Sequence, residues 1–312
     1  MEARAAVRQR YQEALDALAA DLEQDYYVLA AFVYGSVARG EAWERSDIDV
    51  MIVVRDGLER LAEHRWLDVD GINVSAEIMP RGRFKRGLDG GLQGSVMHAI
   101  RSHAKMLFCK DASIAAWFGE GSQIGARDQG FQVMRLASGV VPLLDKAEKW
   151  LYIKDDVHYS FVWAMYTVNA LARVEVVLNG EAPGREVIHQ ALKFNPTFFQ
   201  AVYGDLIDGP KTRERVQQAL DQINAYLEER SETLFGPVLE VLNQANGMRT
   251  AEELDAYFSK KVQSRDLFWC YEWLARREII DRVSSPVRLT RKSQVTLEEP
   301  AYTYEGDPSD WE

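Results

Sequence analysis

Apolar and polar residues follow two different periods in the first hundred residues. Residues 2–24 have apolar side chains at the spacing of one helix face, whereas residues 29–34 and 48–54 are short apolar runs that predict buried strands. Residues 72–79 alternate apolar with polar side chains, as a half-buried strand does. These patterns predict a helix packed on a small β-sheet.

Three further segments lie in this part of the chain. Residues 57–68 have the pattern of a surface helix, with His64 on its solvent side. Residues 81–94 predict a glycine-rich loop with four cations, which could either steer a phosphate-bearing ligand or form a solvated loop. Residues 104–109 predict another strand, which would complete a mixed sheet.

The second half of the chain is dominated by the helical period. Glycines between residues 111 and 128 mark a domain boundary, so a first domain is predicted over 1–118. Long apolar helices are predicted at 130–151 and 156–178, and shorter helices follow them. The pattern predicts an all-α bundle over 126–231.

The last eighty residues combine both periods. The third of three predicted helices covers 265–278 and is followed by β-like segments at 279–283 and 287–290. Three helices and a β-ribbon resemble a winged helix-turn-helix, here over 232–297, and residues 298–312 are predicted to be an acidic tail. The whole chain is therefore predicted to be α+β: a sheet domain with flanking helices, a helical bundle and a winged-helix-like domain.

The polar segment between the first two strands carries the candidate chemistry. Gly35 and Ser36 close the first strand with a turn that can approach a phosphate closely. Asp47 and Asp49 stand two residues apart at the start of the second strand, so strand alternation puts both carboxylates on one face. Two adjacent carboxylates repel each other unless a cation lies between them, and hard oxygen ligands favour magnesium. Glu77, on a later strand, could join them.

A glycine-serine turn, ten intervening residues and then Asp-Ile-Asp resemble the signature of the DNA polymerase β-like nucleotidyltransferase superfamily, over roughly residues 10–118. The resemblance implies a magnesium site, two ions in number, held by three carboxylates that also serve catalysis: Asp47, Asp49 and Glu77. It implies a binding site for ATP or another nucleoside triphosphate at the turn and at the basic residue after it: Gly35, Ser36 and Arg39. The alternative for Glu77 is a strand residue that faces solvent.

The amino-acid composition excludes some classes of function but does not identify a ligand. The 312 residues are 47% hydrophobic and 27% charged, as in ordinary folded proteins, and the formal charge of -11 argues against a protein that mainly coats nucleic acid. No signal-like segment or uninterrupted membrane-spanning stretch is expected, which favours a cytoplasmic protein without membrane contact. Cys109 and Cys270 lack metal-site spacing and are interpreted as buried thiols.

The sequence therefore predicts a magnesium-dependent enzyme. It would move a nucleoside monophosphate, AMP by default, from a triphosphate to an acceptor hydroxyl and release pyrophosphate. The acceptor is left open among a small molecule such as an aminoglycoside, a protein and an RNA, and a homodimer is compatible with the pattern. The alternative is a nucleotide-sensing regulator whose winged-helix domain binds DNA or a protein.

DNA contact by residues 265–278 is the less favoured interpretation. From Arg249 to Lys292 the ten basic residues exceed the seven acidic ones by only about 3, whereas DNA-binding domains are usually far more basic. Several aromatic residues also crowd this helix. A packing or partner-binding role is favoured instead.

Overall fold

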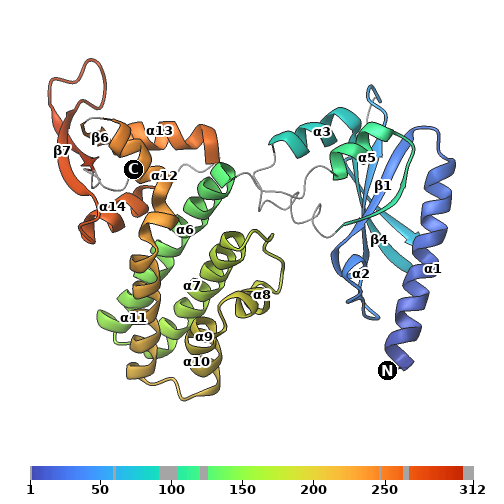
Figure 1. The fold of residues 1–312 in the computed structure, drawn as a ribbon, viewed down its shortest axis with the longest axis horizontal. Helices are drawn as coiled ribbons and strands as arrows, with labels where there is room; N and C mark the ends of the chain where they lie inside the picture. The colour runs from blue at the N-terminus through green and yellow to red at the C-terminus, as the bar shows by residue number, and fades with distance from the viewer. Residues whose placement is uncertain are drawn as a thin grey trace. The chain divides into compact units, whose positions relative to one another are not determined.

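The computed structural model describes residues 2–58, 61–90, 104–119, 126–245, 247–262 and 267–304. The chain divides into two compact units, Met1–Ile124 and Gly125–Glu312 (Figure 1). The α+β class predicted from the sequence is confirmed, because the first unit contains a mixed sheet and the second is mainly helical. The division between the units falls after the first predicted domain; the finer domain boundaries stay predictions.

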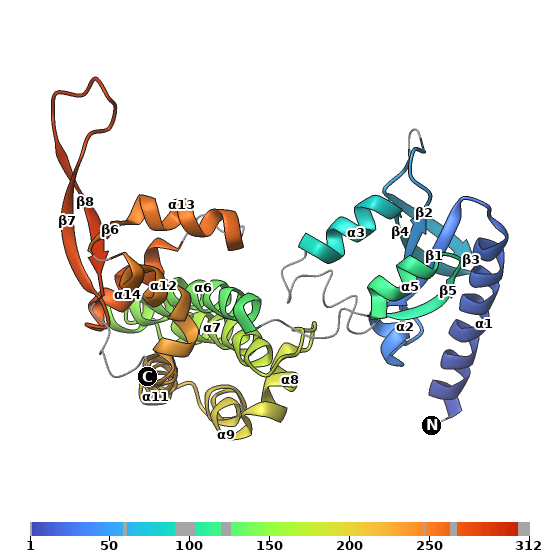
Figure 2. The same cartoon turned by 45° about the horizontal axis from the view of Figure 1, so that its top comes forward.

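The first unit is built on a five-stranded sheet. Its strands are β1 (Val28–Tyr34), β2 (Ile48–Val54), β3 (His64–Val69), β4 (Ile72–Pro80) and β5 (Lys105–Cys109). Their order across the sheet is β3-β4-β2-β1-β5. The β2–β4 pair is parallel and the other pairs are antiparallel, so the sheet is mixed, as predicted (Figure 2).

Helices pack on both faces of this sheet (Figure 1). Helix α1 (Glu2–Gln24) buries its apolar residues against Ile48, Val50 and the other side chains of one face. Helices α3 (Arg81–Gly90) and α5 (Ala112–Gly119) pack on the opposite face, where Phe84 joins Met51 in a second cluster. Because side chains alternate along a strand, Asp49 shares its face with Met51 and lies away from α1.

Two local predictions in this unit were wrong. The helix predicted at 57–68 is replaced by strand β3 at its C-terminal end, while residues 59 and 60 lie outside the described part of the chain. The turn at Asp70-Gly71, where both residues have positive φ, joins β3 to β4 as a hairpin. The loop predicted from residue 81 is helix α3 as far as Gly90, stabilised by the burial of Phe84 and by a hydrogen bond from Gly82 N–H to Asp56 Oδ1.

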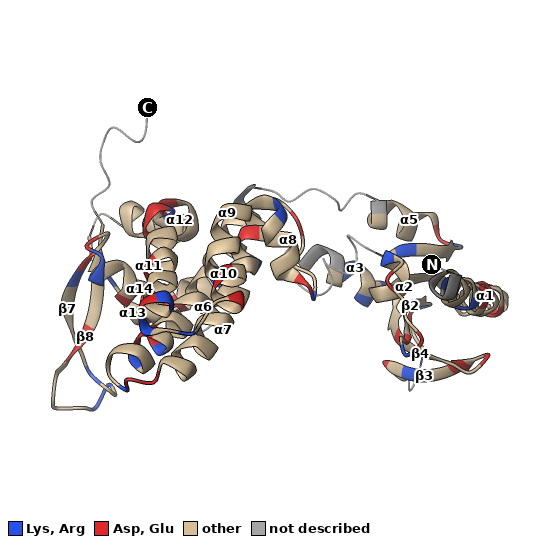
Figure 3. Cartoon of the chain, turned by 90° about the horizontal axis from the view of Figure 1, so that it is seen from below, with Lys and Arg blue, Asp and Glu red and all other residues tan. Residues whose placement is uncertain are grey.

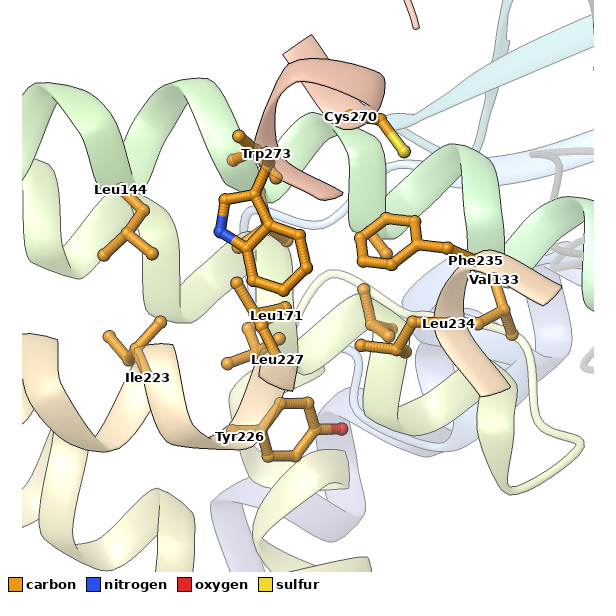
Figure 4. Packing of buried hydrophobic residues seen from close by; sticks show 14 of the residues in the cluster. Val133, Leu144, Leu171, Ile223, Tyr226, Leu227, Leu234, Phe235, Cys270 and Trp273 are labelled. Carbon is orange, nitrogen blue, oxygen red and sulfur yellow. The ribbon is translucent and has the colours of Figure 1, made fainter. Parts of the chain in front are cut away.

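The second unit is a set of packed helices. They are α6 (Ala126–Tyr152), α7 (Val157–Leu178), α8 (Val187–Phe194), α9 (Pro196–Phe199), a π-helical turn (Gln200–Gly204), α10 (Asp205–Asp208), α11 (Arg213–Glu229) and α12 (Ser231–Gln244). The side chains of α6, α7, α11 and α12 meet in one hydrophobic cluster (Figure 4). The predicted succession of helices from 130 to 230 is therefore present.

Helix α7 has the length and composition of a membrane-spanning helix, the one such helix found among the described residues. Arg173 and Glu175 interrupt its apolar sequence, so the expectation that no uninterrupted stretch of this length exists stays a prediction. Half of its apolar window is buried inside the unit, where Val168, Leu171 and Ala172 are fully enclosed. A helix at the centre of a protein core has the same apolar composition.

The C-terminal elements pack on these helices. They are β6 (Arg249–Thr250), α13 (Ala251–Val262), α14 (Phe268–Arg276), β7 (Asp281–Val287) and β8 (Leu297–Thr303), with strand order β6-β8-β7. Cys270 and Trp273 of α14 lie in the same cluster as Phe235 of α12 (Figure 4). The predicted recognition helix is therefore largely a core element.

The predicted ribbon and tail need correction. Strand β7 continues through residues 284–286, which separate the two predicted β-like segments, and its partner is β8, not residues 287–290. The part of the predicted tail up to Thr303 is thus mostly a strand. Ala301 and Tyr302 are fully buried there, and the free energy gained by their burial offsets the entropy lost when the chain is ordered. Residues 305–312 lie outside the described part of the chain.

Candidate active site

The turn after β1 places the backbone of Gly35 against the carboxylate of Asp49. Gly35 has φ +72, a conformation that favours glycine, and a Cβ added there would overlap Asp49 Oδ2 and lie 3.2 Å from its Cγ. A larger residue would therefore strain the backbone and displace the carboxylate. The predicted turn and the predicted acid pair are thus one local structure.

Ser36 lies close to the residue that precedes the acid pair. It belongs to the short helix α2 (Gly35–Arg39), and its hydroxyl lies 3.4 Å from Ser46 Oγ. Ser46 Oγ also accepts a hydrogen bond from Trp43 N–H (3.1 Å), and Tyr11 of α1 donates its hydroxyl to the Ser46 carbonyl oxygen (2.5 Å). These bonds fold the segment between β1 and β2 back on itself and fix the approach to Asp47.

Strand pairing brings the third acid to the same face. Asp49 is in register with Tyr34 on one side and with Ser75 on the other, and Glu77 is in register with Met51 one step along. Paired residues of adjacent strands point to the same face, so the face that carries Asp49 also carries Glu77. We refer to Tyr34, Asp47, Asp49, Ser75 and Glu77 as the carboxylate face.

The electrostatics of Tyr34 agree with this arrangement. Burial raises the pKa of its hydroxyl, and the negative charges of Glu77, Asp49 and Asp47 raise it further, in that order. The phenol therefore stays protonated at neutral pH, as a neutral group beside three carboxylates. Neither Asp47 nor Glu77 forms an ion pair with a described residue.

The donor chemistry of this face fits a hard divalent cation that is only partly held by protein. Among the described residues, no three or more His, Cys, Asp or Glu side chains gather closely enough to form a complete metal site. Magnesium commonly binds one or two carboxylates and completes its shell with water and substrate phosphates. A pair of acids beside a glycine turn suits that mode, with Glu77 farther along the face.

Arg39 forms an ion pair with Glu41, two residues further along the chain. Its Nε lies 2.7 Å from Glu41 Oε2, and the two side chains form an ion pair at the surface. A pocket of about 450 Å³ lies nearby, and its lining includes Val7, Trp43 and Glu44. None of the predicted site residues lines that pocket, so the triphosphate contact predicted for Arg39 stays a prediction.

The basic residues of α3 serve mainly to hold the unit together. Arg81 donates from Nε to Asp111 Oδ2 and from Nη2 to Ser113 Oγ, both at 2.7 Å, and Arg83 forms an ion pair with Glu63. The Nζ of Lys85 lies 5.1 Å from the centre of the Trp117 ring. Three of the four cations therefore have partners inside the unit.

Sequence reasoning missed two side chains near the carboxylate face. His64 is in register with Glu77 and Trp66 with Ser75, so both point to that face from the edge strand β3. His64 Nε2 lies 3.1 Å from Ser75 Oγ. The signal available in the sequence was Asp70-Gly71, a strong hairpin turn between this segment and the alternating residues 72–79.

The structure brings together the glycine turn, the acid pair on the next strand and a third acid on its parallel neighbour. Residues 15–103 match the family model of the nucleotidyltransferase domain. No curated protein matches the sequence. This unit is therefore a nucleotidyltransferase domain of the DNA polymerase β-like superfamily, as the sequence predicted.

A solved structure resembles the chain over almost its whole length. It is a nucleotidyltransferase-like protein from Exiguobacterium sibiricum 255-15, with a TM-score of 0.63 and 16% sequence identity. The match covers 96% of this chain and 99% of that one. At this identity the likeness shows a shared fold, including the helical second unit.

Proposed function

We propose that the protein transfers a nucleoside monophosphate from a magnesium-bound nucleoside triphosphate, ATP by default, to an acceptor hydroxyl. The observation that carries this proposal is the contact between the backbone of Gly35 and the carboxylate of Asp49. It joins the turn that can approach a phosphate to the acids that can hold its metal. The domain family supports nucleotidyl transfer in general.

The three acids of the carboxylate face and the nearby Ser36 each have a role in this proposal. Asp47 and Asp49 hold the divalent cations, and Glu77 is the third carboxylate. Ser36 contributes a hydroxyl and a backbone N–H to the triphosphate at the turn. The bound ions supply charge neutralisation at the α-phosphoryl group and favour ionisation of the attacking hydroxyl.

Every bond, electron pair and proton of the proposed transfer can be accounted for with these groups and the two substrates. The acceptor oxygen bonds to the α-phosphorus while the bond from that phosphorus to the bridging oxygen breaks. The electron pair leaves with pyrophosphate. The hydroxyl proton passes to a carboxylate of the site, for which Glu77 is the candidate because it lies on the same face one step beyond Asp49.

The proposal is tested with labelled ATP, magnesium and a panel of aminoglycosides, proteins and tRNA. Asp47→Asn and Asp49→Asn should each reduce label transfer by at least about 10²-fold, because each removes a charge that offsets the charge developing in the transition state. Asp21→Asn, on the exposed surface of α1, is the matched control and should retain activity. Thermal unfolding should show that all three variants are folded. Full activity in both site variants would refute the mechanism.

A further inference from the structure

Helix α6 buries polar groups that the surrounding protein does not satisfy. Gln132, Arg135 and Gly139 stand three and four residues apart, so they lie on one face of the helix. Gln132 is 1% exposed, and neither Nε2 nor Oε1 of its amide has a hydrogen-bond partner in the part of the chain that the structure describes. The Nε of Arg135 is buried in the same condition. Buried polar groups normally have partners, so this face of α6 has donors that protein contacts do not use.

The guanidinium of Arg135 has no counter-charge. Among the described residues it forms no ion pair, although its side chain is partly buried. Burial lowers the pKa of this group, and no nearby carboxylate raises it again. An arginine side chain nevertheless stays protonated in a protein. The second unit therefore holds a positive charge without a negative one beside it.

The shielded acids of the helices packed on this part of α6 have other partners. In α7 the acid is Glu175, whose Oε2 accepts a hydrogen bond from Tyr226 Oη (2.6 Å) and whose Oε1 accepts one from Asn179 Nδ2 (3.2 Å). In α13 the acid that is not exposed is Asp255, and its Oδ1 accepts a hydrogen bond from Tyr271 Oη (3.1 Å). These carboxylates stabilise contacts between helices and do not neutralise the guanidinium.

Gly139 leaves space beside the two polar side chains. It is exposed, and a Cβ added there would have no atom within 4 Å. A glycine inside a helix costs stability relative to alanine, and at this position it leaves the turn next to Arg135 uncovered. Lys146, seven residues further along the same face, is exposed and forms no ion pair with a described residue. A negatively charged ligand can approach the guanidinium along this face.

We propose that Gln132 and Arg135 bind a phosphate group at this face of α6. The N–H groups of a guanidinium match two oxygens of a phosphate, and the amide Nε2 of Gln132 can donate a hydrogen bond to a third. A phosphate group also supplies the missing negative charge, which neither water nor a neutral ligand does. The site needs no divalent cation, so it is independent of the transfer proposed for the carboxylate face.

Calorimetry on the full chain with inorganic phosphate, and separately with pyrophosphate, tests the site in buffer with EDTA and no magnesium. The wild type should bind one molecule per chain, and Arg135→Gln should weaken binding at least about tenfold because it removes the charge. Arg135→Lys keeps the charge without the planar fork and should retain part of the affinity. Gln132→Leu should weaken binding less than Arg135→Gln. Phosphate should also raise the Tm of the wild type more than that of Arg135→Gln.

A second measurement separates binding from folding. In phosphate-free buffer, Arg135→Met should have the same Tm as the wild type or a higher one, because it removes a buried charge without a partner. A lower Tm would show that Arg135 stabilises the fold by itself and would contradict the proposal. Arg173→Gln, which changes an exposed arginine of α7, is the matched control and should leave the phosphate affinity unchanged.

Two further results would overturn the site: no binding of phosphate or pyrophosphate by the wild type, or equal binding by the wild type and Arg135→Gln. With magnesium and a non-hydrolysable ATP analogue, these two proteins should show the same affinity within about twofold. A loss of analogue affinity in Arg135→Gln would assign Arg135 to the triphosphate site and end the case for a separate one. Failure of the wild type to bind the analogue would instead count against the proposed function and leave the phosphate site standing.

Discussion

The carboxylate face of the first unit and the surroundings of α14 in the second unit use charge in opposite ways. On the carboxylate face, Asp47 and Glu77 lack ion-pair partners among the described residues. Around α14 the charges are matched: Arg276 Nη2 lies 3.3 Å from Asp145 Oδ2, and Arg277 Nη1 lies 2.6 Å from Glu228 Oε1. Unmatched charge is available to a ligand, whereas matched charge holds elements together.

This difference also bears on the DNA-binding alternative. Acidic and basic residues are interspersed over the helices of the second unit (Figure 3). The two arginines at the end of α14 are bound to α6 and α11, and Cys270, Tyr271 and Leu274 are fully buried. Burial raises the pKa of the Cys270 thiol to about 12, so it stays a neutral core group. These contacts support the packing role that the sequence favoured for this helix.

Gly35→Ala gives the largest expected effect within this comparison. The new methyl group would meet the Asp49 carboxylate and place a Cβ on a residue with φ +72. We expect a loss of stability of about 1–3 kcal/mol and a strong loss of nucleotidyl transfer. Urea unfolding and label transfer measure the two effects. Gly139→Ala, in a helix with open space around the position, is the control, and equal behaviour of the two variants would contradict the close contact.

Glu272→Gln tests whether the matched charges are structural. Glu272 Oε1 lies 2.7 Å from Tyr302 Oη and 2.9 Å from Arg282 Nε, so the variant should lose about 1–3 kcal/mol of unfolding free energy at pH 7 without loss of nucleotide binding. Partial burial opposes ionisation, but the bonds from Tyr302 and Arg282 outweigh it and lower the pKa of this carboxyl from its ordinary value of 4.5.

The sign of the pH dependence follows from this lowered pKa. The stabilisation by ionised Glu272 is present above pH 4.5 and is lost as pH falls through the lower pKa of the folded state. The stability difference between wild type and Glu272→Gln should therefore shrink as the pH is lowered below 4.5. Denaturant unfolding at a series of pH values measures it. A difference that grows with acidification would contradict the assignment.

Arg83→Ala is expected to have the smallest effect. The ion pair of Arg83 with Glu63 lies at the surface, with side chains 52% and 72% exposed, so its loss should change stability by less than about 1 kcal/mol. Arg81→Ala removes a guanidinium that bonds to two side chains and lies over Trp117, and it should cost more. Equal losses in the two variants would show that exposure does not decide the value of these contacts.

Much of the site followed from the sequence because its parts are local. The turn at Gly35 and the pair Asp47 and Asp49 lie within fifteen residues, and the two-residue period of a strand fixes which side chains share a face. Glu77 required one further step, since its place depends on the pairing of β4 with β2. The alternation predicted for residues 72–79 indicates which side of its own strand Glu77 occupies. Only the structure shows the register that aligns β4 with β2.

Other features depended on partners distant in the sequence. His64 and Trp66 lie on β3 because that segment pairs with β4, although the same residues have a helix-like pattern in isolation. Residues 297–303 look like an acidic tail until Tyr302 is placed in a core built by distant helices. Short segments with mixed patterns take their structure from the contacts that bury them.

The sequence by itself determined the strand–turn–strand unit with its acid pair, because chain connectivity and side-chain alternation suffice for that arrangement. Tertiary structure decided that Glu77 joins the same face, that His64 and Trp66 flank it, and that α14 lies in a core. Those outcomes depend on which strands pair and which apolar surfaces meet, and such choices are set by the summed burial of the whole chain.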